Sequence, residues 1–171
     1  MKKKHYVFLM QGSNNGDRKK YLEDSFILIQ KNIGNIIQKS SYFESEAWNM
    51  KKNTPLFYNR VLHVETIYSP IFILKTIFSI EKMIGKETHI QSMKKTVYKN
   101  RKIDIDILLY DSIIMNSNLL TIPHPMLHLR KFVLLPMSNI IPEKIHPILN
   151  KSIVEILGLC SDSLIVKKIN I

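Results

Sequence analysis

The strongest constraint on the fold is an alternating run at residues 100–111, N-R-K-I-D-I-D-I-L-L-Y-D. Its isoleucines alternate with Asp104 and Asp106, a period of two that is typical of a β-strand with one buried face. Both carboxylates then project from the same face, with their Cα atoms about 6.5–7 Å apart. Like charges at this separation repel each other, which is tolerated on a solvated face or around a cation such as Mg²⁺. Taken alone, the pair fits both interpretations.

Other strands are predicted by alternation and by β-branched or aromatic residues. The segment 59–67 alternates apolar with polar residues and is expected to be a half-buried strand. The segment 35–45 is expected to form one strand, a first strand is expected at 6–11, and a closing strand at 164–169. The chain therefore contains five strand candidates when the aspartate strand is included.

Two helices are predicted between these strands by apolar residues that recur three or four positions apart. Asp17 is a candidate N-cap for the first helix, and Gly34 is expected to end it. Ser69 and Pro70 are residue types that favour an N-cap and a first helical position, and Gly85 is expected to end the second helix.

A third helix is expected from about Arg130, and the capping box S-I-V-E at 152–155 opens a fourth. Helices and strands thus interleave, while neighbouring strands could pair as hairpins. The pattern predicts an α+β fold, with a ferredoxin-like, mostly antiparallel sheet flanked by helices in an αβα sandwich. The length of 171 residues fits a single domain over 1–171, in which 151–171 form a C-terminal helix and strand of unassigned role.

The composition favours a cytoplasmic protein. Cys160 is the one cysteine, so the chain has no internal disulfide and suits a reducing compartment. No apolar run reaches the roughly 18 residues that a membrane span needs. The apolar stretch near the N-terminus, about five residues long, is too short for the core of a signal peptide. We therefore expect no membrane partner.

The positive charge of the chain is compatible with binding to nucleic acid or to another anionic partner. Lys and Arg number 25 against 14 Asp and Glu, and the formal net charge of +11 favours anionic partners. The basic segment 86–102 lacks a core-like period and is expected to be a mobile loop. An RNA-binding sheet would need exposed aromatic residues on its central strands, whereas the aspartate strand would repel phosphates unless a metal is bound. We therefore expect a phosphorylated small molecule rather than nucleic acid.

Six motifs occur together along the chain up to about residue 145. They are G-S-N-N-G-D-R (12–18), S-S-Y-F-E-S-E-A-W (40–48), P-L-F-Y-N-R-V-L-H-V-E-T (55–66), I-E-K-M-I-G (80–85), R-K-I-D-I-D-I-L-L-Y-D (101–111) and I-P-H-P-M-L-H-L-R-K-F-V-L-L-P-M (122–137). In these motifs, in their order and in their spacing, the chain resembles the 6-hydroxymethyl-7,8-dihydropterin pyrophosphokinase family. The pair R-x-x-D-I-D-I-L and I-P-H-P is the most specific part of this resemblance.

The resemblance implies an enzyme of folate biosynthesis. Members of this family transfer the terminal pyrophosphoryl group of ATP to the hydroxymethyl oxygen of the pterin, which produces the pterin diphosphate and AMP. Two Mg²⁺ ions are implied, and phosphoryl transfer depends chiefly on positioning and charge neutralisation. The implied partners are the pterin and ATP, without nucleic acid or membrane, and the implied state is a monomer.

The resemblance also implies roles for individual residues. Asp104 and Asp106 are the implied metal ligands, and Arg101 and Arg130 are implied to act with them in catalysis. The implied contacts with ATP come from Glu81, Lys86, Tyr98, His124 and Arg130. The implied pterin site combines loop groups, an amide that reads the edge of the pterin and two stacking rings: Ser45, Trp48, Phe57, Asn59 and Phe132.

The chain departs from the family's pattern at three places. Lys86 and Thr88 stand where a pair of arginines is usual, and Y-K-N-R at 98–101 stands where W-G-P-R is usual. Leu119 stands where a further arginine is often found. Lysine keeps the charge but lacks the bidentate guanidinium that grips phosphate oxygens. Weaker ATP binding is expected, and the alternatives are a lapsed enzyme or another Mg²⁺-dependent phosphoryl or nucleotidyl transferase.

Overall fold

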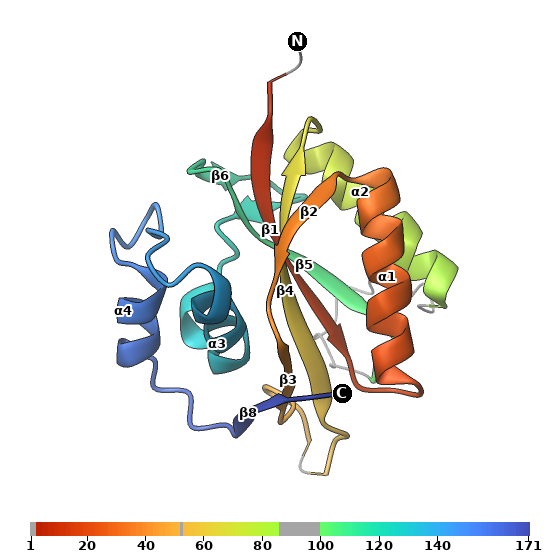
Figure 1. Ribbon diagram of the computed structural model, residues 1–171. Helices are drawn as coiled ribbons and strands as arrows, with labels where there is room; N and C mark the ends of the chain where they lie inside the picture. The colour runs from red at the N-terminus through yellow and green to blue at the C-terminus, as the bar shows by residue number, and fades with distance from the viewer. Residues whose placement is uncertain (1–2, 52, 86–99) are drawn as a thin grey trace.

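The computed structural model describes residues 3–51, 53–85 and 100–171. Within these ranges a sheet lies between two pairs of helices, so the molecule has three layers (Figure 1). One face of the sheet is covered by α1 and α2, and the other by α3 and α4. The bounds of these helices are Arg18–Asn32, Pro70–Ile84, Lys131–Ile140 and Ile153–Leu159. This arrangement confirms the expected α+β sandwich.

The strands of the main sheet follow the order β5-β1-β4-β3-β8, and β2 also pairs with β4. Every pairing in the described sheet is antiparallel. A short hairpin of β6 and β7 and a 3-10 turn, η1, precede α3. The bounds are β1 (His5–Ser13), β2 (Asn35–Lys39), β3 (Tyr42–Ser45), β4 (Phe57–Thr66), β5 (Asp104–Tyr110), β6 (Met115–Asn116), β7 (Thr121–Ile122), β8 (Val166–Ile169) and η1 (Leu127–Leu129).

The register of the central strands aligns three residues across the sheet. Gly12 of β1 lies opposite Asn59 of β4 on one side and opposite Asp104 of β5 on the other. Met10 lies opposite Asp106 in the same way. β4 and β5 are about 45 residues apart in the sequence. Because β1 pairs with both of them, Asn59 and Asp104 lie on either side of the same residue of β1.

One strand prediction needs correction, and another is confirmed. The single strand expected at 35–45 is two strands, β2 and β3, because Ser40 interrupts the ladder. Its hydroxyl accepts a hydrogen bond from the Val61 amide at 3.0 Å and donates one to the Ser41 carbonyl at 2.7 Å. The strand expected at 59–67 runs from Phe57 to Thr66, and residues from Asn59 to Leu62 are all buried. The predicted alternation of Leu62 and Val64 with His63 and Glu65 is confirmed, since the first two are buried and the other two are partly exposed.

The helix boundaries follow the capping residues seen in the sequence. The Asp17 carboxylate accepts from the Lys20 amide at 3.0 Å, and Gly85 ends α2 with a positive φ of 102°. Gly34, which follows α1, is required for a different reason. The backbone of Glu65 approaches it closely, and no left-handed turn is involved. A Cβ atom built on Gly34 would lie 2.1 Å from the Glu65 carbonyl oxygen. Among the helices in the described ranges, none has both the length and the hydrophobicity of a membrane span.

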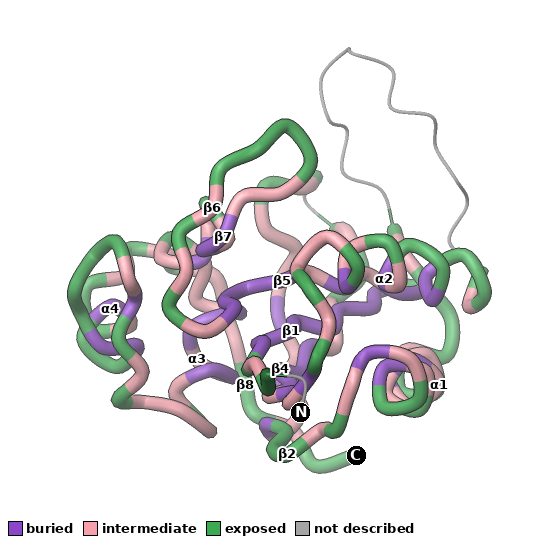
Figure 2. The backbone as a smooth tube through the Cα atoms, turned by 90° about the horizontal axis from the view of Figure 1, so that it is seen from above, coloured by how far each residue is buried: buried purple, intermediate pink, exposed green. Residues whose placement is uncertain are grey.

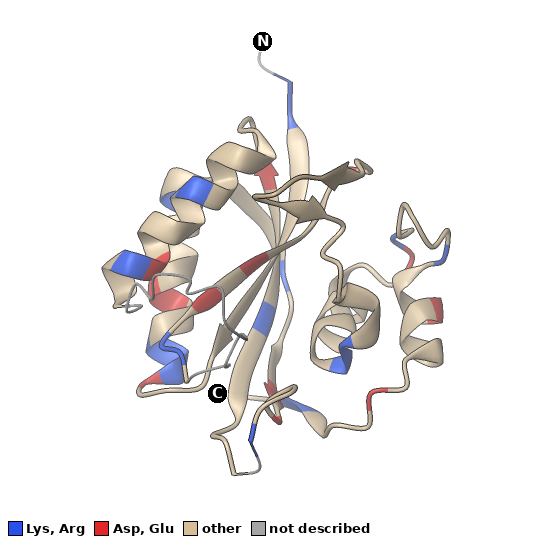
Figure 3. Ribbon diagram, turned by 180° about the vertical axis from the view of Figure 1, so that it is seen from behind, with Lys and Arg blue, Asp and Glu red and all other residues tan. Residues whose placement is uncertain are grey.

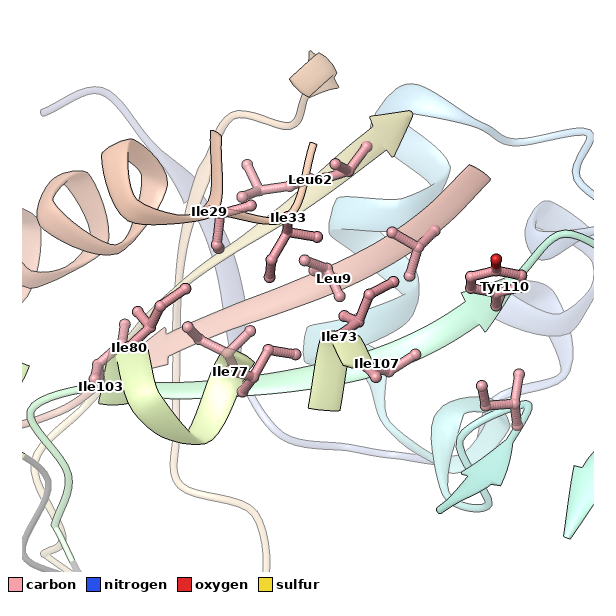
Figure 4. Close-up of a cluster of buried hydrophobic side chains, with 14 of the residues drawn as sticks. Leu9, Ile29, Ile33, Leu62, Ile73, Ile77, Ile80, Ile103, Ile107 and Tyr110 are labelled. Carbon is pink, nitrogen blue, oxygen red and sulfur yellow. The ribbon is translucent and has the colours of Figure 1, made fainter. Parts of the chain in front are cut away.

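The core is divided by the sheet into two clusters. The larger one joins the sheet to α1 and α2, and Figure 4 shows Ile29 of α1, Ile77 of α2 and Leu9 of β1 converging there. Burial is accordingly concentrated along the strands and on the inward faces of the helices (Figure 2). Ile105 and Ile107 belong to this cluster. The aspartates that alternate with them therefore project toward the face on which α3 lies.

A buried arginine connects α1 to the sheet. Arg60 of β4 is 1% exposed, and its guanidinium donates to the Gln11 side chain at 2.9 Å and to the Glu23 carboxylate at 2.8 Å. It also donates to the Leu22 carbonyl and to the Tyr42 hydroxyl. A buried charge is tolerated when it is paired and hydrogen-bonded in this manner. The alternation in the sequence did not predict this network.

Gly34→Ala is expected to lower the free energy of unfolding by about 1–3 kcal/mol, because the added methyl group would overlap the Glu65 carbonyl. Gly158→Ala is the matched control, since a Cβ atom there meets nothing within 4 Å and the position is helical. The control is expected to be neutral or slightly stabilising. Urea unfolding of both variants measures the difference, and equal stabilities would contradict the close-approach explanation.

Candidate active site

One pocket gathers most of the residues that the sequence singled out. It lies on the α3 side of the sheet, where β1, β4 and β5 meet the loop that follows β3. Its lining contains nine predicted site residues: Ser45, Trp48, Phe57, Asn59, Arg101, Asp104, Asp106, Arg130 and Phe132. Met10, Gly12, Glu46 and Met50 complete the lining. Residues from five separate segments are thus brought to one place.

A second pocket adjoins the first. It is lined by the two other described candidates, Glu81 and His124, and by an apolar group that contains Leu74, Phe78, Leu119 and Leu120. Asp104 and Asp106 line this pocket as well as the first. The two carboxylates therefore lie at the junction between the pockets. Lys86 and Tyr98, which were predicted to contact ATP, lie outside the described residues, as does most of the basic segment 86–102.

Two carboxylates and two arginines meet at the junction. Figure 3 shows acidic positions along β5 in the middle of the molecule. Burial raises the pKa of Asp106 to about 7, and the charge of Asp104 adds to this rise, while Arg130 and Arg101 oppose it. The Arg101 guanidinium also forms an ion pair with Asp104. Among the described residues, burial and the charge of Asp104 therefore outweigh the two arginines in setting the pKa of Asp106.

The donor set at the junction fits Mg²⁺. In the described part of the chain, no group of three or more His, Cys, Asp or Glu side chains is placed to hold a metal ion. The protein would therefore supply Asp104 and Asp106 and leave the other positions to water and phosphate oxygens. This division is typical of Mg²⁺, which binds through one or two carboxylates and keeps much of its hydration.

His124 is held as a neutral hydrogen-bond donor. Burial and, to a smaller extent, the neighbouring charge of Arg130 lower its pKa to about 4. Its Nδ1 accepts from the Met126 amide at 3.1 Å, so the ring proton lies on Nε2. The backbone of His124 is fixed to β5, because its amide donates to the Leu108 carbonyl at 2.9 Å. An Nε2–H group in this pocket can donate to a phosphate oxygen.

Arg130 lies between two aromatic rings. Its guanidinium carbon is 4.6 Å from the centre of the Trp48 ring and 5.8 Å from that of Phe132. Its Nε is buried and has no hydrogen-bond partner among the described residues. Cation–π contacts hold the group in place while leaving its N–H donors available to an anion.

The first pocket also contains one buried side-chain amide. Asn59 donates to the Ser45 hydroxyl at 2.8 Å, and both residues are buried. Phe57 lies beside Asn59 along the pocket wall. A Cβ atom built on Gly12 would lie 3.4 Å from the Asn59 side-chain oxygen and 3.7 Å from the Phe57 ring, so glycine leaves this space open. A planar heterocycle with polar edges suits such a slot.

Sequence reasoning missed the residue that joins the loops around the site. Asn14 is 2% exposed, and its side-chain amide donates to the Pro55 carbonyl at 3.3 Å and to the Asn100 side chain at 3.0 Å. Its side-chain oxygen accepts from the Arg101 amide at 2.7 Å. Asn14 thus connects the loop before β4 to the residues before β5. In the sequence it resembles its neighbour Asn15, and no local signal distinguishes the two.

The raised pKa of Asp106 predicts a pH dependence of stability in metal-free protein. The folded state keeps a proton that the unfolded state releases, so stability is lost as the pH rises from about 4 to about 7. Asp106→Asn removes this dependence. Urea unfolding in EDTA at pH 5 and pH 8 should therefore show that the variant gains stability over the wild type mainly at pH 8. A difference that is the same at both pH values would contradict the assignment.

Comparison with known proteins agrees with this geometry. The family model described as 7,8-dihydro-6-hydroxymethylpterin-pyrophosphokinase (HPPK) matches residues 8–142. The 2-amino-4-hydroxy-6-hydroxymethyldihydropteridine pyrophosphokinase of Aquifex aeolicus is 36% identical over 149 residues, which cover 87% of this chain and 88% of that protein. The protein of the same name from Porphyromonas gingivalis is 34% identical, with 82% and 93% covered.

Longer proteins also contain a similar region. The folic acid synthesis protein fol1 of Schizosaccharomyces pombe is 34% identical over 91% of this chain, which spans 20% of that protein. The crystal structure of Plasmodium falciparum HPPK-DHPS has the same fold, with a TM-score of 0.71 at 20% identity. The alignment covers 92% of this chain and 44% of that one. From the family match and the two relatives of similar length, this chain belongs to the 7,8-dihydro-6-hydroxymethylpterin-pyrophosphokinase family.

Proposed function

We propose that this chain transfers the pyrophosphoryl group of ATP to 6-hydroxymethyl-7,8-dihydropterin, giving the pterin diphosphate and AMP, as a step of folate biosynthesis. The observation that carries the proposal is the pair of pockets that share Asp104 and Asp106. One pocket suits a planar heterocycle and the other a phosphorylated nucleotide. A group that passes from one ligand to the other would move across the two carboxylates.

The pterin is proposed to bind in the first pocket. Phe57 and Phe132 would stack on its two faces, and Asn59 would read its edge, where hydrogen-bond donors and acceptors alternate. Ser45 supports this amide through its hydroxyl, and Trp48 closes the wall together with Arg130. The hydroxymethyl group would then point toward the carboxylates at the junction.

ATP is proposed to bind in the second pocket. Its base would lie against the apolar side chains there, and His124 would donate to its phosphates through Nε2. Glu81 lines this pocket and accepts from the Ile105 amide at 2.9 Å, so it also holds β5 in position. Lys86 and Tyr98 are proposed to contact the nucleotide on the strength of the family resemblance. Leu119, which is 72% exposed, lines the pocket where an arginine is often found.

The chemistry depends on positioning and on charge. Asp104 and Asp106 would hold Mg²⁺, and we propose two ions, as the resemblance implies. When bound, Mg²⁺ supplies charge neutralisation for the phosphate oxygens and orients the leaving group. Arg101 and Arg130 are proposed to donate to oxygens that gain negative charge during transfer. The pterin hydroxyl oxygen forms the new bond to the β-phosphorus and releases its proton to solvent, and AMP departs with the electron pair of the bond between the β-phosphorus and the bridging oxygen.

The setting of the enzyme is also proposed. A monomer is proposed on the strength of the family resemblance. The cytoplasm is proposed because the single cysteine, Cys160, is a free thiol. Small molecules are the proposed partners, since the two aspartates would repel the backbone of a nucleic acid.

The reaction itself is tested by a product assay with ATP, Mg²⁺ and 6-hydroxymethyl-7,8-dihydropterin. AMP and the pterin diphosphate are expected, and EDTA is expected to abolish both. Asp106→Ala should reduce turnover by at least about a thousandfold, because it removes a proposed metal ligand. Asp24→Ala, an exposed change on α1, is the charge-matched control and should keep normal activity. Release of ADP instead of AMP would contradict the proposed reaction.

Phe132→Ala is expected to weaken pterin binding on the order of tenfold, since it removes one face of the proposed stack. Binding of ATP with Mg²⁺ should change little, because Phe132 does not line the second pocket in the described structure. Calorimetric titration of each ligand separates the two effects. Equal losses of affinity for both ligands would count against the stacking role.

A further inference from the structure

The C-terminal segment is bonded to residues beside the first pocket, although it carries no recognisable motif. It follows α4 and lies beyond residues 8–142, the part of the chain that matches the family model. In Figure 1 the chain leaves α4, passes below α3 and reaches β8, which lies beside β3. Residues 162–166 therefore run from one wall of the first pocket to the other.

At one wall the segment is bonded to the loop that follows β3. The Glu46 amide donates to the Ile165 carbonyl at 3.1 Å, and the Ile165 amide donates to the Glu46 carboxylate at 2.9 Å. The next residue, Val166, lies opposite Ser45 in the β3–β8 ladder. Glu46 stands between Ser45 and Trp48 in the sequence and itself lines the pocket. The position of this wall is thus tied to the C-terminal segment.

At the other wall the same segment caps α3. One oxygen of the Asp162 carboxylate accepts from the Lys131 amide at 3.0 Å, and the other accepts from the Leu164 amide at 3.1 Å. Lys131 is the first residue of α3, and it stands between Arg130 and Phe132. Arg130 occupies the N-cap position with a side chain that can only donate, so it cannot cap the helix itself. Asp162 provides the acceptor and a negative charge at the helix N-terminus.

We propose that residues 162–166 act as a strap that sets the spacing between the two walls of the pterin pocket, with Asp162 as a positioning residue. That the ligand of this pocket is the pterin rests on the proposed function. Without the strap, the wall carrying Trp48 and the wall carrying Phe132 would have to be ordered when the pterin binds, which reduces affinity. ATP should be affected less than the pterin, since Glu81 and His124, which line the second pocket, lie on other segments of the chain.

Asp162→Ala tests the strap in the full-length chain. The KM for the pterin is expected to rise on the order of fivefold, the size of effect expected from the loss of a helix cap. The KM for ATP should change less than the KM for the pterin, because in the described part of the chain Glu81 and His124 lie on segments that are not bonded to Asp162. Asp162→Asn keeps one acceptor oxygen and loses the charge, so it should restore part of the pterin affinity.

A second readout needs no ligand. Trp48 is the only tryptophan of the chain, and it stacks against Arg130 at the pocket wall. Acrylamide quenching of its fluorescence should increase in Asp162→Ala, because a loosened wall exposes the ring. Ile165→Pro removes the amide that bonds to Glu46 and should increase quenching independently. Asp24→Ala, which removes an exposed carboxylate from α1, should leave the quenching and the pterin KM unchanged.

The outcomes separate the strap from the proposed function. Lower melting temperatures of Asp162→Ala and Ile165→Pro, with wild-type pterin KM and wild-type quenching, would mean that the segment only stabilises the fold, and the proposal would be overturned. If the wild type turns over no pterin, the proposed function fails. In that case the quenching of Trp48 still tests whether residues 162–166 hold the pocket wall, since quenching does not depend on the identity of the ligand.

Discussion

The site depends on the antiparallel pairing of β1 with both β4 and β5. This pairing sets Asn59, Gly12 and Asp104 side by side, so that the amide proposed to read the pterin and the carboxylates proposed to bind metal lie across one glycine. The isoleucines of β5 are buried against α2, which forces the aspartates to the opposite face. Their repulsion cannot be relieved by rotating the strand without exposing that core. The fold therefore holds two like charges together at the place where the pockets meet.

The positive charge near these carboxylates would come partly from Arg101 and Arg130 and partly from the proposed Mg²⁺. Arg101 and Arg130 oppose the rise in the pKa of Asp106 without cancelling it. A site with enough arginine to neutralise both aspartates would have little affinity for a divalent cation. A site without arginine would bind the cation but lack donors for the phosphates. The observed balance suits a reaction in which negative charge arrives with one substrate and is redistributed during transfer.

Much of the fold could be predicted from the sequence, as could the position of the aspartate pair that lines both pockets, since these signals are local. The alternation of Asp104 and Asp106 with isoleucines places them on one face, and the caps at Asp17, Ser69 and Gly85 lie within one turn of the helices that they bound. The pterin residues came from the resemblance to a family rather than from periodicity. Arg60, Asn14 and Asp162 gave no signal, because their partners lie 49, 87 and 31 residues away. Gly34 was expected to end a helix, and its actual reason, the approach of Glu65, also depends on a distant segment.

The pairing of β8 with β3 makes the two ends of the chain unequal as points of attachment. The start of β1 lies opposite Thr66, at the far end of the strand from Gly12 and the pocket. β8 ends at Ile169, two residues before the last residue of the sequence, and it lies directly beside the strand that carries Ser45 (Figure 1). A domain or tag joined before β1 would be remote from the proposed pterin pocket. One joined after Ile171 would follow the strand that pairs with Ser45, so its bulk would lie near a wall of that pocket.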